Sequence, residues 1–318
     1  MLKTTHLGQF MIQGANALPT NFQSGAELVL IFAKTLLIVL GTIGGLYGLV
    51  CWILWRWQER LTFLPSRRIV HTPEEYGLDY EELWLPVPQS QGDRLHSWWL
   101  SATNTTPAVL LLHGNGFNIG ANLPQAKVFH DLGYPVLLVD YRGYGRSEGP
   151  FANEPQVYTD AQVALNYLQQ GRGLQHQDII VFGHSMGGAI AIELAQRNPN
   201  LGALIIQGSF TSLRQMVDHD GIYGWLPIDR IMRQSFDSIA KVPHLKMPLF
   251  FVHGDGDRRV PSWMSEQLYA AATAAIKELY ILPGVDHNHV PEMGSAAYVQ
   301  RVRDFLNRIV PEHLSNLT

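Results

Sequence analysis

The sequence predicts an α/β domain, in which helices cover both faces of a mostly parallel β-sheet, preceded by an N-terminal transmembrane helix. From about residue 80 onward, short continuous apolar runs alternate with helical stretches, as expected of strands that are buried on both faces. Before residue 58, one uncharged run is much longer than any of these. We therefore expect a membrane anchor followed by one large domain.

Length and composition limit the classes of protein to consider. With 318 residues and 46% hydrophobic residues, the chain can form the core of one large α/β domain. A formal net charge of -4 lacks the basic excess that nucleic-acid binding requires, so no nucleic-acid partner is expected. The single cysteine, Cys51, excludes an internal disulfide framework.

An uncharged run of 20 residues, 36–55, is long enough to cross the hydrocarbon core of a bilayer as an α-helix. A cleaved signal peptide would have a shorter apolar region that ends in small residues. This run ends instead in an aromatic and cationic flank, formed by Trp52, Trp55, Arg56, Trp57 and Arg60. The pattern therefore favours an uncleaved single-pass anchor.

Charges around this run predict its orientation. Four arginines follow it, whereas Lys3 and Lys34 alone precede it, so the positive-inside bias places the C-terminal domain in the cytoplasm. The pairs Gly41/Gly45 and Gly44/Gly48 have a spacing that lets membrane helices pack closely. Glycine is frequent in such helices, so the oligomeric state stays unknown.

Four segments follow from these patterns. Residues 1–25 show neither helical nor strand periodicity and are interpreted as an irregular tail. Residues 26–57 form the anchor, 58–79 a juxtamembrane linker, and 80–318 the α/β domain.

The elements of the α/β domain are predicted in chain order. Strands are expected at 82–87, 95–100, 108–112, 136–140, 178–182, 203–207, 249–252 and 277–282. Helices are expected near 122–132, 157–170, 188–197, 263–275 and 296–309. Ligands bind beyond the carboxyl ends of parallel strands, so functional residues should directly follow strands.

Ser185 lies in Gly-His-Ser-Met-Gly, residues 183–187, between an apolar run and a helical stretch. A strand that turns sharply into a helix strains the residue at the turn and needs small neighbours. The turn exposes the serine hydroxyl and directs the amides of the helix N-terminus at an oxyanion beside it. The motif can arise by chance in a glycine-rich chain, but its context favours a nucleophile.

A serine nucleophile needs an imidazole base and usually a carboxylate that orients the base. Asp255 and Asp257 share the loop after the strand at 249–252, and either can reach an imidazole. We choose Asp257 and expect the other to be a turn residue, a common role of aspartate.

Two histidines follow the last predicted strand. We choose His287 over His289 because it lies closer to the strand end. Asp286 beside them suggests a metal cluster, but no helix-spaced histidine pair or further carboxylates accompany it, so no metal or other cofactor is predicted. Ser185, Asp257 and His287 then have the chain order of a nucleophile-elbow enzyme.

A second oxyanion donor is expected from the loop after an earlier strand, because one amide stabilises an oxyanion incompletely. The glycine-rich string His-Gly-Asn-Gly, residues 113–116, directly follows such a strand. We predict that the backbone amides of Asn115 and Met186 bind the oxyanion, and that His113 is structural.

Over residues 80–309 the chain resembles the α/β-hydrolase family. The matching strings stand in the family's order at 113–114, 140–145, 183–188, 253–261 and 284–287. It looks most like the membrane-anchored branch with a single N-terminal span, which includes protein depalmitoylases. The string at 208–213 carries part of this similarity, although it lacks the Ser-Pro pair that relatives often have there.

The resemblance and the residues together predict a membrane-anchored serine hydrolase that cleaves ester or thioester bonds through an acyl-enzyme. Its substrate would be an acyl ester or thioester, lipid-like or a lipidated protein. Residues 215–243 form a short lid, in which 222–227 line an acyl pocket or contact the bilayer, unless they pack on the sheet. The alternatives are an amidase or peptidase with the same triad, and a non-catalytic membrane scaffold.

Overall fold

The structure is a computed structural model that describes residues 25–309, without the side chains of 292–295. The tail predicted for residues 1–25 lies outside the described residues except for Gly25. The chain divides into two compact units, one that ends at Ile53 and one that begins at Leu54.

The N-terminal unit consists of most of helix α1, Gly25–Thr62, which is 38 residues long. Its described side chains up to residue 50 are all exposed, and its most apolar window has a mean hydropathy of 2.2. The helix is long and apolar enough to cross a membrane. It extends beyond the expected 36–55 because Glu27 and Lys34 interrupt the uncharged run but are good helix formers.

The second unit is built on an eight-stranded sheet with the order β10-β9-β8-β7-β4-β6-β3-β2. The strands are β2 Tyr80–Pro86, β3 Arg94–Leu100, β4 Ala108–Leu112, β6 Val136–Val139, β7 Ile179–His184, β8 Ala203–Gln207, β9 Leu249–Gly254 and β10 Lys277–Leu282. Strand β3 is antiparallel to both β2 and β6, and the other pairs are parallel. The predicted mostly parallel sheet is confirmed.

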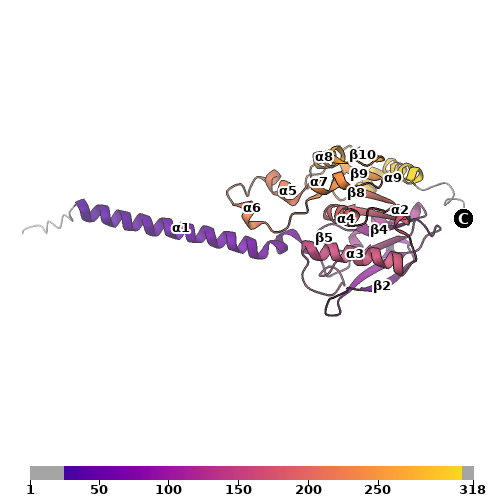
Figure 1. Cartoon of the computed structure of the whole chain (residues 1–318), viewed down its shortest axis with the longest axis horizontal. Helices are drawn as coiled ribbons and strands as arrows, with labels where there is room; N and C mark the ends of the chain where they lie inside the picture. Colours follow the sequence, from indigo (N-terminus) through magenta and orange to yellow (C-terminus); the bar gives the residue numbers. More distant parts are fainter. Residues whose placement is uncertain (1–24, 310–318) are drawn as a thin grey trace, which may run out of the picture. The chain divides into compact units, whose positions relative to one another are not determined.

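Helices cover both faces of this sheet (Figure 1). They are α2 Leu123–Asp131, α3 Glu154–Gln170, α4 Met186–Arg197, α8 Trp263–Ala271 and α9 Val290–Ile309. Short 3-10 helices stand at Pro73–Tyr76, Ile119–Asn122, His176–Asp178 and Val242–His244. The side chains of β4 alternate between the two faces, so that Leu110 and Leu112 face α3 and α4, whereas Val109 and Leu111 face α2 and α9.

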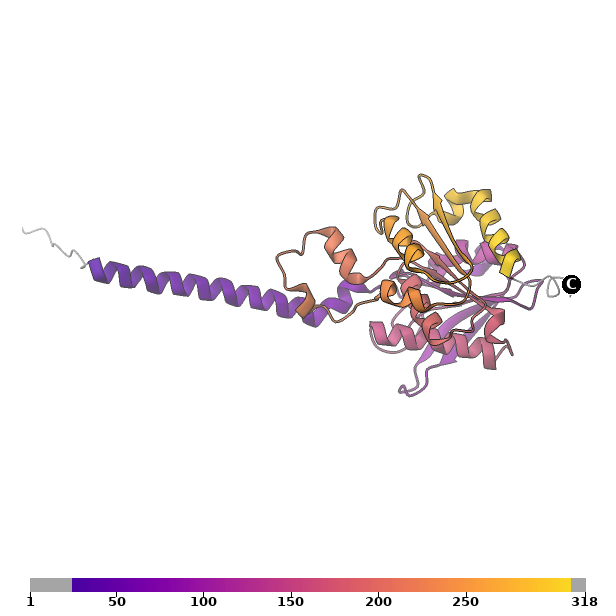
Figure 2. The same cartoon turned by 45° about the horizontal axis from the view of Figure 1, so that its top comes forward.

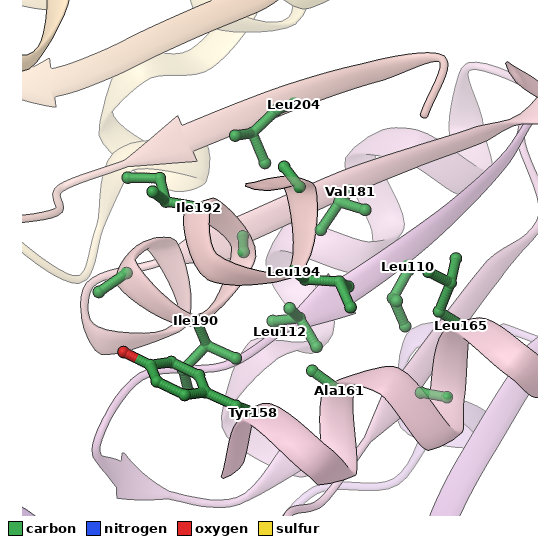
Figure 3. Packing of buried hydrophobic residues seen from close by; sticks show 14 of the residues in the cluster. Leu110, Leu112, Tyr158, Ala161, Leu165, Val181, Ile190, Ile192, Leu194 and Leu204 are labelled. Atoms are coloured by element: carbon green, nitrogen blue, oxygen red, sulfur yellow. The ribbon is translucent and has the colours of Figure 1, made fainter. Parts of the chain in front are cut away.

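The core under α3 and α4 holds the central strands in place. Figure 3 shows Leu112 of β4 between Ile190 of α4 and Ala161 of α3, and Leu110 of β4 beside Leu165 of α3. All of these side chains are fully buried. This packing fixes the point at which β7 ends and α4 begins.

The segment expected as a linker, 58–79, is packed onto the second unit. Strand β1, Leu64–Pro65, pairs in parallel with β5, Gly116–Phe117, and Phe63 is buried. The pairing joins residues about fifty positions apart, so no local pattern predicts it. Contacts therefore extend the second unit back to Leu54, whereas the expected domain begins at residue 80.

The chain between β8 and β9 contains α5 Leu213–Asp220, α6 Ile228–Ile231 and α7 Ser238–Lys241. Both views place α5 and α6 beside the last turns of α1 (Figure 2). The Glu154 carboxylate at the start of α3 accepts hydrogen bonds from the amides of Ser235 and Phe236, at 2.6 and 2.8 Å. These bonds hold the returning end of the insertion on the sheet unit.

Candidate active site

Ser185 occupies the sharp turn between β7 and α4. Its φ of 56° and ψ of -122° lie where residues with a side chain are strained. A Cβ on Gly183 would collide with the carbonyl oxygen of Gly187, and a Cβ on Gly187 would collide with that of Leu112. Residues 183 and 187, on either side of the serine, must therefore be glycine, because neighbouring backbone lies too close to leave room for a side chain.

The structure brings Ser185, His287 and Asp257 together from three separate loops. The Ser185 hydroxyl donates to His287 Nε2 at 3.0 Å, and His287 Nδ1–H donates to Asp257 Oδ2 at 2.5 Å. Each of the three residues is 8% exposed. A hydroxyl, an imidazole and a carboxylate connected in this order can pass a proton from the serine to the imidazole.

Asp257 is held as a carboxylate by four donors. Its Oδ1 accepts from the amides of Arg259 and Val260, at 2.8 and 2.9 Å, and its Oδ2 accepts from His253 as well as His287. Burial opposes ionisation, but the hydrogen bonds from the two histidines outweigh it and hold the pKa of Asp257 well below its usual range. The carboxylate can therefore stabilise an imidazolium at His287.

The alternative residues of both loops lie elsewhere. Asp255 is exposed and accepts from the amide of Gly284 at 2.5 Å, so it is a turn residue. His289 is exposed and pairs with Asp286 at 2.8 Å rather than with Ser185. Among the described residues, no group of three or more His, Cys, Asp or Glu side chains is arranged so that it could hold a metal ion.

Two buried histidines next to the triad were not predicted. His253 Nε2–H is shared between Asp257 and the Val260 carbonyl, and its Nδ1 accepts from Ser265 at 2.6 Å. His184 Nε2–H donates to the His287 carbonyl at 3.0 Å. His184 directly precedes Ser185, and His253 stands near the end of β9. Both therefore lie inside the sequence motifs that located the triad, and this position was the only sequence feature that could have pointed to them.

Burial lowers the pKa of His184 to about 3, and the nearby His287 adds to the effect. The His184 ring is therefore neutral near pH 7. Its centroid lies 5.0 Å from that of the His287 ring. A neutral donor at this place fixes the backbone of His287 without opposing a positive charge on its imidazole.

Asn115 and Met186, the two predicted oxyanion donors, lie in the same pocket as Ser185. Met186 is the first residue of α4, where an N–H has no partner inside the helix. Neither amide N–H donates a backbone hydrogen bond within the part of the chain that the structure describes. The carbonyl of Asn115 accepts from the Leu64 amide and the Tyr144 hydroxyl, which orients this peptide.

Comparisons with known proteins identify the family of this chain. Residues 103–241 match the family model Hydrolase_4, described as serine aminopeptidase S33. Protein bem46 of Schizosaccharomyces pombe is 33% identical over 266 residues, which cover 80% of this chain and 87% of that protein. The α/β hydrolase domain-containing protein WAV2 of Arabidopsis thaliana is 29% identical over 277 residues, which cover 80% of this chain and 89% of that protein.

This chain belongs to the α/β-hydrolase family. An uncharacterized membrane protein of Saccharomyces cerevisiae is a further relative, 28% identical over 80% of this chain and 90% of its own. Among solved structures, the Pyrococcus furiosus esterase Pf2001 has a TM-score of 0.65 at 20% identity, over 78% of this chain and 97% of the esterase. The structural likeness supports the fold.

The α/β hydrolase has an apolar pocket of about 380 Å³ that opens at Ser185. Its lining includes Ser185, Met186, Asn115 and His287. The other lining residues come mainly from the insertion and the end of α1, and include Leu213, Met216, Val217, Leu226, Ile231, Phe236, Leu54 and Leu61. The insertion expected as a lid therefore lines this pocket.

A second pocket of about 210 Å³, which is more polar than the first, meets it at Ser185. Four residues line both pockets, namely Asn115, Ser185, Arg259 and His287. The remaining lining of the second pocket includes Asn122, Gln125, Asn288 and His289. The hydroxyl of Ser185 is thus reached from an apolar side and from a polar side.

Proposed function

We propose that this α/β hydrolase is a membrane-anchored serine hydrolase that cleaves carboxylic ester or thioester bonds. The observation that carries the proposal is the chain of hydrogen bonds from Ser185 through His287 to Asp257, formed at a strained turn beside an apolar pocket. The residues that would act are Ser185, His287 and Asp257, with the amides of Asn115 and Met186.

Each step follows from a contact at this site. His287 Nε2 takes the hydroxyl proton while Ser185 Oγ forms a bond to the acyl carbonyl carbon, and the Asn115 and Met186 amides bind the resulting oxyanion. The oxyanion collapses, the bond to the leaving oxygen or sulfur breaks, and His287 gives that atom the proton. Water then repeats the sequence on the acyl-enzyme and releases the carboxylic acid and free Ser185.

The two pockets suggest how a substrate lies across Ser185. An aliphatic acyl chain loses unfavourable contact with water in the apolar pocket, whereas a polar alcohol or thiol leaving group is better solvated in the second pocket. Arg259 borders both pockets and offers a positive charge near the scissile bond.

The anchoring part of the proposal rests on α1 and its flanks. The helix has the length and hydropathy of a single span, and the yeast relative is named as a membrane protein. Arginines after the span support a cytoplasmic position for the hydrolase domain. Lipids or lipidated proteins would then reach the site by diffusion within the membrane.

A fluorophosphonate probe tests the nucleophile. The wild-type protein and Ser97→Ala, a matched change of a buried serine in β3, should be labelled, whereas Ser185→Ala should not. Ester turnover should fall about 10⁴-fold or more in Ser185→Ala, because no other group replaces the hydroxyl. Labelling that persists in Ser185→Ala would refute the assignment, and absent labelling of wild type would favour a non-catalytic scaffold.

Amide hydrolysis is the second candidate, because the matching family model is described as serine aminopeptidase. The same triad can attack either bond, so the site alone does not distinguish them. Turnover of an ester and an amide of the same acyl group separates the two candidates. Because an amide is intrinsically less reactive than the matching ester, amide turnover as fast as ester turnover would already replace the ester proposal.

A further inference from the structure

The last turns of α1 form one wall of the apolar pocket. The lining residues Leu54, Gln58, Leu61 and Thr62 follow at intervals of four, three and one, which places them on one face of the helix. The opposite wall is the insertion, with Met216 of α5 and Ile231 of α6. The pocket therefore depends on the helix that also carries the predicted membrane span.

Hydrogen bonds fix this helix end to the insertion. Gln58 is 9% exposed, its Nε2 donates to the Ile231 carbonyl at 3.1 Å, and its Oε1 accepts from the Arg233 amide at 2.7 Å. The Arg233 guanidinium pairs with Glu59 at 2.7 Å and lies 4.9 Å from the Trp55 ring centroid. We name these contacts the α1 clamp. The end of α1 can separate from the insertion only if several of these contacts break.

The same helix end also holds the predicted oxyanion loop. Asn115 Nδ2 donates to the Thr62 carbonyl at 3.1 Å, and the Leu64 amide donates to the Asn115 carbonyl at 2.9 Å. The uncharged run of the predicted span ends at Trp55, and the pocket lining already begins at Leu54. The chain therefore has no linker between the apolar run and the pocket.

We propose that the last two turns of α1 form the acyl-chain subsite and set which chain lengths the enzyme accepts. This inference rests on the proposed ester or thioester hydrolysis. The substrate class that fits is an ester or thioester of a long unbranched fatty acid, because Leu54 and Leu61 line an apolar pocket together with apolar residues of the insertion, and the Gln58 amide between them is bonded to Ile231 and Arg233. The membrane helix is thus a part of the binding site as well as an anchor.

The test compares hydrolysis of palmitoyl and acetyl esters with the same leaving group, by the full-length protein in detergent micelles. In Leu54→Trp and Leu61→Trp the larger side chain occupies part of the pocket, which leaves less room for a long acyl chain than for an acetyl group. The ratio of kcat/KM for the palmitoyl ester over the acetyl ester should therefore fall about tenfold or more. Leu54→Ala enlarges the pocket and should not lower this ratio. Ile53→Trp, a change of the neighbouring residue that does not line the pocket, is the matched control and should keep the wild-type ratio.

The outcomes separate this inference from the function on which it rests. An unchanged ratio in both tryptophan variants, with fluorophosphonate labelling of Ser185 retained, would overturn the inference and leave the hydrolase intact. A fall of the same size in Ile53→Trp would also overturn it. Wild-type protein that neither hydrolyses the esters nor reacts with the probe would overturn the proposed function and the inference together.

Discussion

At the scale of the residue, the site is governed by what surrounds each polar group. Ser185 is strained in its backbone and is held there by hydrogen bonds from its own amide to the Gln207 carbonyl and from Ser209 Oγ to its carbonyl, both 2.8 Å. Gly208 next to Gln207 has a φ of 57°, a backbone conformation that residues with a side chain rarely adopt. The strain is thus balanced by neighbours that come from the end of β8.

His184 is expected to make the stability of the fold depend on pH. Its folded pKa of about 3 lies below the value of about 6.5 for an unfolded chain, so between these values the unfolded chain binds more protons. Its contribution to stability is complete above about pH 6.5 and is lost as the pH falls, by about 1.4 kcal/mol per pH unit.

Replacing His184 by Asn removes the titrating ring, together with the Nε2–H that donates to the His287 carbonyl. The melting temperature of His184→Asn should therefore fall less steeply than that of wild type between about pH 6.5 and pH 5. Scanning calorimetry in detergent measures both slopes, and His219→Asn on the exposed surface of α5 controls for the loss of a histidine. Parallel slopes in wild type and His184→Asn would contradict this expectation.

At the scale of the element, the insertion between β8 and β9 is tied down at two places. Its return is bonded to Glu154 at the start of α3, and its middle is bonded to Gln58 of α1. Between these points, Ile222 and Trp225 are 66% and 59% exposed. We expect the stretch around these two residues to open more readily than the sheet unit, since few buried contacts hold it.

Gln58→Ala should loosen this insertion. The substitution removes two hydrogen bonds between α1 and the insertion, each of which contributes about 0.5–1.5 kcal/mol. Limited proteolysis should therefore cut residues 213–236 several times faster than in wild type. Gln300→Ala on α9, whose side chain bonds to Asp304 and Arg303 of the same helix, is the matched control. Unchanged cleavage rates would show that the α1 clamp does not hold the insertion.

At the scale of the whole molecule, the second unit begins inside α1, at Leu54. Deleting residues 1–53 should therefore leave the pocket wall, whereas deleting residues 1–63 removes this wall and the partner of Asn115 Nδ2. Turnover of a water-soluble acetyl ester per probe-labelled site should survive the first deletion and fall at least about tenfold in the second. Equal turnover of the two proteins would mean that α1 acts as an anchor only.

Much of the sheet could be predicted because its strands carry a local signal. Continuous apolar runs such as 108–112 and 203–207, each followed by turn residues, became β4 and β8 with the expected bounds. The elbow at Ser185 was recognisable for the same reason, since strand, glycines, serine and helix are consecutive in the chain. The expected linker over 58–79 was less accurate, because the partner of Leu64 is Gly116.

The sequence by itself determined the order of strands and helices, the span-like helix and the serine at its turn, because these depend on residues that are neighbours in the chain. Only the tertiary structure decided that His287 bonds Ser185 and Asp257 bonds His287, whereas Asp255 and His289 lie elsewhere. The tertiary structure also decided that the C-terminal end of α1 lines the pocket. Both outcomes depend on contacts between residues far apart in sequence, and periodicity carries no information about such contacts.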